Sequence, residues 1–132
     1  MPTELMWLTY TLLMTALFWL PYVLNRMAVR GLMGTMANPS PDLPPQAAWA
    51  ERARAAHANA AENLVIFAPL VLVATALGIT GGLVASAAIL YFWSRLIHYV
   101  VYTLGWPVIR TLAFFGGFVA QIMVVWAILS GM

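Results

Sequence analysis

The side chains best suited to chemistry in this sequence are polar and ionisable residues at helical spacing in two largely apolar stretches, with one arginine shortly after a proline. They are Arg52, Asn59, Glu62, Arg95, His98, Tyr102 and Arg110. A guanidinium group is a planar fork that matches a carboxylate, so several of them around one cleft suit a small anionic ligand. The sequence therefore predicts capture of an acidic small molecule.

The elements that position these side chains are expected to lie in a membrane. Of the 132 residues, 64% are hydrophobic and 8% are charged, whereas about a quarter of the residues of a soluble domain are charged. The chain has no cysteine, which excludes a secreted disulfide scaffold. Its formal charge of +2 is too small for a nucleic-acid-binding protein, which must neutralise many phosphates. We expect an integral membrane protein whose surroundings are lipid.

Four segments are long and apolar enough to cross a bilayer core, which takes about 20 residues as a helix. They are residues 5–24, 58–77, 83–104 and 108–129. Four prolines between positions 39 and 45 predict a loop over residues 25–46. The polar, alanine-rich stretch before Leu64 favours helix and is expected to continue into the second span. The whole chain, residues 1–132, is predicted to be one all-α, four-helix membrane bundle.

The arginines near the span ends predict the orientation of this bundle. They cluster at one end, whereas the glycine turn near Gly78 and both termini carry no Lys or Arg; the clustered arginines are Arg26, Arg30, Arg52, Arg54 and Arg110. Because basic loops stay in the cytoplasm, the first and third loops are expected there. In a bacterial inner membrane, both termini would then face the periplasm.

Two ionisable side chains lie at similar predicted depths in the bilayer. Counted from the far surface, Glu62 is at roughly 22 Å and Arg95 at roughly 18 Å. Leaving either charge alone in lipid costs about 2.5–3.5 kcal/mol. The sequence therefore predicts a Glu62–Arg95 ion pair, which would either line a polar cleft or simply hold the helices together.

Other kinds of site find little support in the sequence. His57 and His98 lie on different helices and no cysteine is present, so no metal site is expected. We find no glycine-rich phosphate loop and no Ser/His/acid combination.

Motif order and spacing along the whole chain resemble the MAPEG superfamily, the membrane-associated proteins in eicosanoid and glutathione metabolism. The resemblance is greatest to its short bacterial members and to the microsomal glutathione transferases. It rests on the motifs Glu51-Arg52-x-Arg54-x-Ala56-His57-x-Asn59-x-x-Glu62-Asn63-x-x-x-Phe67, Arg95-x-x-His98-x-x-x-Tyr102 and Pro107-x-x-Arg110. Where many members of the superfamily have further basic residues this chain has Ala55 and Ala58, and Phe114 replaces an aromatic hydroxyl.

The resemblance implies a homotrimer that binds glutathione between neighbouring subunits. By the same resemblance, Arg110 would stabilise the glutathione thiolate, with the hydroxyl of Thr111 beside it. The residues implied to bind glutathione are Arg30 from the adjoining subunit and Arg52, Asn59, Glu62, Arg95, His98 and Tyr102.

The implied activity is that of a glutathione-dependent transferase or peroxidase, in which the thiolate attacks a hydrophobic electrophile that arrives through the lipid. The main alternative is a non-catalytic trimer of the same fold that binds lipid or serves as an accessory subunit of a membrane complex. An ion or proton conduit is less favoured, because the polar residues stop short of the far side, where only Thr75 and Thr80 are polar.

Overall fold

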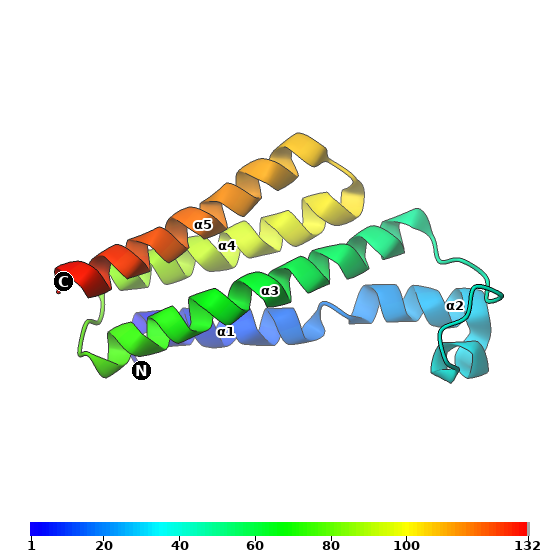
Figure 1. Cartoon of the computed structure of the whole chain (residues 1–132), viewed down its shortest axis with the longest axis horizontal. Helices are drawn as coiled ribbons and strands as arrows, with labels where there is room; N and C mark the ends of the chain where they lie inside the picture. The colour runs from blue at the N-terminus through cyan, green and yellow to red at the C-terminus, as the bar shows by residue number, and fades with distance from the viewer. Residues whose placement is uncertain (132) are drawn as a thin grey trace.

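The computed structural model describes residues 1–131, where all regular secondary structure is α-helical (Figure 1). The helices are α1 (Thr3–Leu17), α2 (Leu20–Met36), α3 (Ala48–Ala76), α4 (Gly82–Leu104) and α5 (Pro107–Ser130). With α1 and α2 counted together, four helical segments in this part of the chain are long and apolar enough to cross a membrane. The predicted four-span, all-helical fold is therefore confirmed.

The first span is broken in its middle, where the sequence predicted one helix over residues 5–24. α1 ends at Leu17 and α2 begins at Leu20, with Pro21 at its start. Proline has no N–H to donate, and its ring clashes with the carbonyl group one helical turn earlier. The break just before Pro21 therefore has a local cause. The hydroxyl of Tyr99 donates to the carbonyl oxygen of Phe18 over 2.9 Å and so satisfies one acceptor at the break.

The loop after the first span is shorter than the predicted residues 25–46. α2 continues to Met36, and the irregular segment covers only residues 37–47, which contain all four prolines. The difference arises because the prolines on which the prediction rests all lie after Met36, so nothing in residues 25–30 ends the helix. Gly31 interrupts that helix at φ 69° and ψ 173°, a conformation open essentially to glycine alone.

α4 and α5 match their predicted spans within one residue at each end, whereas α3 begins ten residues before the predicted span 58–77. α3 runs without a break from its polar first half into its apolar second half, as the alanine content predicts. Gly105, in the left-handed conformation, ends α4, and Pro107 begins α5. Both termini lie at the same end of the bundle (Figure 1), as an even number of crossings requires.

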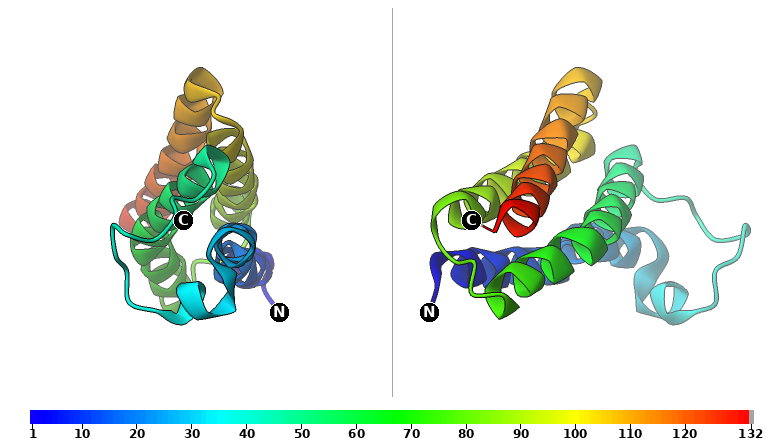
Figure 2. Two further views of the ribbon diagram at one scale, coloured as in Figure 1. Left: turned by 90° about the vertical axis from the view of Figure 1, so that its right-hand side faces the viewer. Right: turned by 60° about the vertical axis from the view of Figure 1, so that its left-hand side comes forward.

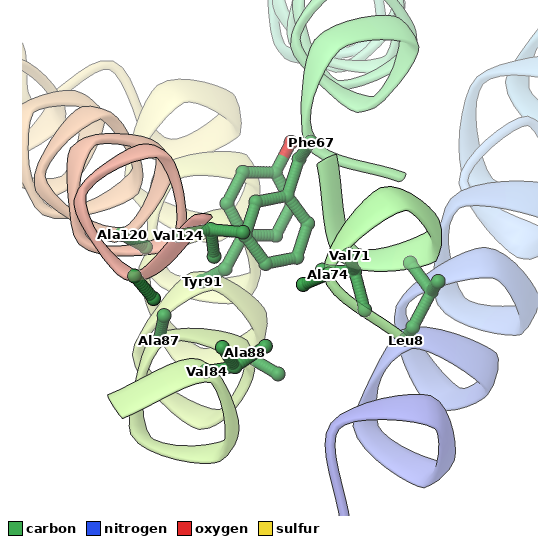
Figure 3. Close-up of a cluster of buried hydrophobic side chains, with 11 residues drawn as sticks. Leu8, Phe67, Val71, Ala74, Val84, Ala87, Ala88, Tyr91, Ala120 and Val124 are labelled. Carbon is green, nitrogen blue, oxygen red and sulfur yellow. The ribbon is translucent and has the colours of Figure 1, made fainter. Parts of the chain in front are cut away.

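Helix α4 contacts three of the other helices of the bundle. α4 packs along α5, and both α3 and α1 also contact α4. α2 contacts α3, beside the loop that extends past the bundle (Figure 2). In the core, the rings of Phe67 and Tyr91 stack at 3.7 Å between centroids (Figure 3). Around them lie Leu8, Val71, Ala74, Val84, Ala87, Ala88, Ala120, Val124 and Ala127.

A second buried cluster lies near the arginine-bearing end. Its members are Phe18, Ala53, Ala56, Ala60 and Tyr99. The three alanines on α3 are at most 3% exposed. The face of α3 that carries them therefore packs against α1 and α4. That rotation decides which polar residues of α3 point into the bundle.

Candidate functional site

A small polar cavity lies where α3, α4 and the first turns of α5 meet, near the arginine-bearing end. Its volume is about 220 Å³. The lining residues are Asn59, His98, Tyr102, Arg110, Thr111 and Phe114. The structure thus gathers five of the predicted site residues from three helices into one place.

Arg110 belongs to the first turns of α5, which begins at Pro107. Its guanidinium carbon lies 4.5 Å from the centre of the Tyr102 ring, a cation–π contact that holds the charge over the cavity. The unsatisfied N–H groups at the start of a helix carry a partial positive charge, which adds to the charge of the arginine. This part of the cavity is therefore suited to an anionic atom.

Arg95, another predicted site residue, does not line the cavity but is buried behind two of its lining residues and is only 2% exposed. Its Nη2 atom donates to Oδ1 of Asn59 over 2.6 Å and lies 3.4 Å from Nδ1 of His98. Its Nε atom has no hydrogen-bond partner in residues 1–131. Arg95 therefore contacts two residues of the cavity wall, Asn59 and His98, and can orient them without lining the cavity itself.

The predicted Glu62–Arg95 ion pair is wrong for the single chain. Arg95 binds the amide of Asn59, and Glu62 is exposed on the surface of α3. At 3.6 residues per turn, Glu62 lies about 150° around the helix from the face formed by the buried alanines. Burial of those alanines turns Asn59 to the edge of the interface and Glu62 away from it.

Two further predicted ligand residues lie outside this cavity. The Nε atom of Arg52 donates to the carbonyl oxygen of Thr103 over 3.0 Å, so Arg52 binds the last turn of α4. This contact places a positive charge at a helix C-terminus, where it is favourable. Arg30 lines a different cavity on α2 and donates from Nε to the carbonyl oxygen of Pro44 over 2.8 Å.

Phe114 lines the cavity, although its sequence position indicated only the replacement of an aromatic hydroxyl. It lies four residues after Arg110, and residues four apart share one face of a helix. Its ring lies 6.3 Å from that of His98. The spacing from Arg110 was therefore the signal that could have identified it.

A family model provides the decisive comparison with known proteins. The model of the MAPEG family matches residues 5–130, which is nearly the whole chain. The chain belongs to the MAPEG family. The comparison with curated proteins returns no match.

Family membership agrees with the geometry of this MAPEG protein. The motif residues of the second and third spans and the arginine after Pro107 meet in the cavity, although they are separated by up to about 50 positions in the sequence. Membership makes the chain a membrane protein of the superfamily concerned with glutathione and eicosanoid metabolism.

Proposed function

We propose that this protein is a glutathione-dependent membrane transferase or peroxidase. The observation that carries the proposal is the placement of Arg110 over Tyr102, in a cavity shared with Asn59, His98 and Thr111. A thiol reacts as its thiolate, and a neighbouring guanidinium at a helix N-terminus favours the thiolate. Arg110 is thus suited to activating a bound thiol.

In the transferase reaction, the glutathione thiol would release its proton to water while Arg110 stabilises the sulfur anion. The sulfur electron pair would form the new S–C bond, and the leaving group of the electrophile would depart with its own electron pair. In the peroxidase reaction, two glutathione molecules would be oxidised to the disulfide while a hydroperoxide is reduced to an alcohol and water.

The size of the cavity supports a site that a neighbouring subunit completes. Its volume of about 220 Å³ is below the range of about 300–1,000 Å³ that is usual for small-molecule pockets. Glu62 and Arg30 lie outside the cavity of their own chain, where an adjoining chain can use them. We therefore propose a homotrimer in which glutathione binds between subunits, with Asn59, His98 and Tyr102 on one side.

The test is glutathione binding to purified protein, followed by the ultraviolet absorbance of the thiolate. Arg110→Ala is expected to lower the thiolate signal by about tenfold or more, because a cation close to an acid shifts its ionisation by that much. Thr9→Ala, on the exposed surface of α1, is the control and keeps the signal. If the unchanged protein binds no glutathione at millimolar concentration, the enzyme proposal is rejected in favour of a non-catalytic trimer.

A further inference from the structure

A second and larger cavity lies at the end of the molecule, where α2, the loop of residues 37–47 and the start of α3 meet. Its volume is about 360 Å³. Arg26 and Arg30 line it from α2, and Arg54 and the acidic Glu51 line it from α3. Three guanidinium groups against one carboxylate give the lining a net positive charge.

The backbone and two hydrogen bonds give this cavity a defined shape. The glycine-only conformation of Gly31 turns the last residues of α2 aside, and the loop then returns to α3 (Figure 1). The Nε atom of Arg26 donates to Oε1 of Gln46 over 3.1 Å, and that of Arg30 to the carbonyl oxygen of Pro44. Within residues 1–131 the bond of Arg26 uses Nε only, so the terminal nitrogens of its guanidinium group are available to a ligand.

Counted in residues along the first span, the cavity is expected at the level where the bilayer core ends. Arg26 is about 23 residues beyond the start of α1, and about 20 residues of helix cross the core. Large apolar side chains lie exposed on the turned end of α2 beside the cavity: Leu32 is 59%, Met33 76% and Met36 65% exposed. A segment with basic residues on one part and exposed apolar residues on another is typical of a helix that lies in the membrane interface.

We propose that this cavity binds the phosphate of an acidic phospholipid headgroup, while Leu32, Met33 and Met36 contact the acyl chains of the same leaflet. Arginine forks bind phosphate oxygens through paired, charge-assisted hydrogen bonds. The hydroxyl of Ser40, which also lines the cavity, accepts from the backbone N–H of Asp42 over 3.2 Å and retains its own hydrogen to donate. Free phosphate would satisfy the arginines but would leave the adjacent apolar side chains without a partner.

The test uses the purified protein in a zwitterionic detergent and measures bound lipid by native mass spectrometry. Phosphatidylglycerol, phosphatidylcholine and inorganic phosphate are titrated separately. Because one arginine near a membrane surface contributes about 1 kcal/mol, Arg54→Gln should weaken phosphatidylglycerol binding about fivefold and Arg26→Gln with Arg54→Gln about 25-fold. Arg54 is exposed, so the single variant is expected to fold. Arg30 stays unchanged because the proposed function assigns it to glutathione.

Glutathione binding separates this proposal from the proposed function. Arg54→Gln should bind glutathione as the unchanged protein does, and Arg110→Gln should keep phosphatidylglycerol binding. Equal binding of phosphatidylglycerol and phosphatidylcholine would overturn the headgroup site. The site would also be rejected if inorganic phosphate binds where phosphatidylglycerol does not, or if Arg54→Gln and the double variant leave lipid binding unchanged.

Discussion

The charged guanidinium group of Arg95 contacts only neutral hydrogen-bonding groups in its own chain, as far as residues 1–131 show: the amide oxygen of Asn59 and the imidazole of His98. A buried charge that loses a hydrogen-bond partner is left without compensation, and a bond to a charged group is worth about 1.5–3 kcal/mol. We therefore expect Asn59→Ala to lower the free energy of unfolding by about that amount. The measurement is denaturant unfolding of the purified protein in detergent.

A double-mutant cycle separates this bond from the general cost of changing α3. Once Arg95→Met has removed the charge, Asn59→Ala should cost less than it does in the unchanged protein. The difference between the two costs should be about 0.5–3 kcal/mol, the range for residues in contact. Strictly additive costs would show that the 2.6 Å bond contributes nothing to stability.

At the scale of helices, α5 packs against Ser94 of α4 at Gly116, where no side chain would fit without a shift. A Cβ atom built there would overlap Oγ of Ser94 and lie 3.2 Å from its Cβ. We expect Gly116→Ala to destabilise the protein by about 1–3 kcal/mol, the usual cost of overpacking a close interface. Thermal unfolding in detergent measures this effect.

A second substitution, at Ser94, should restore the stability that Gly116→Ala loses. Ser94→Gly removes both atoms that the new methyl group would meet. Ser94→Gly with Gly116→Ala should therefore unfold at a higher temperature than Gly116→Ala alone. If the double variant is no more stable than the single one, the steric explanation fails.

At the scale of the whole molecule, the homotrimer proposal predicts that subunits share sites. Arg30 lies in a different cavity from Arg110 within one chain, so the proposed site takes these two residues from neighbouring chains. Arg30→Ala and Arg110→Ala subunits should each fail to form the glutathione thiolate alone. Co-expressed and purified together, they should recover part of the ultraviolet signal, because some mixed trimers contain one intact site.

Two controls make the mixing experiment decisive. Separately purified variants that are combined only after solubilisation in detergent should not recover the signal if the trimers do not exchange subunits. A mass of one chain, 14.5 kDa, for the purified protein would reject the trimer. A trimer without complementation would place Arg30 outside the glutathione site.

Much of the candidate site could be predicted from residue types and spacing. Asn59, His98, Tyr102 and Arg110 belong to the sequence motifs, the resemblance adds Thr111, and all five line one cavity. Helical spacing groups Asn59 with the polar face of the second span and His98 with Tyr102 on the third, whereas the roles of Arg110 and Thr111 were implied by the family resemblance. The pairing of Arg95 was not predictable in this way. Depth in the bilayer favours Glu62, which lies almost one helical turn nearer to the depth of Arg95 than Asn59 does, whereas the partner depends on how α3 is rotated.

The sequence by itself determined that the chain crosses the membrane four times as helices. In hydrocarbon every backbone N–H and C=O group must be satisfied within the segment, so length and hydrophobicity are enough to predict the spans. Only the tertiary structure decided how each helix is rotated about its axis. That rotation depends on the close packing of Ala53, Ala56 and Ala60 against neighbouring helices, which turns Asn59 toward Arg95 and leaves Glu62 on the surface.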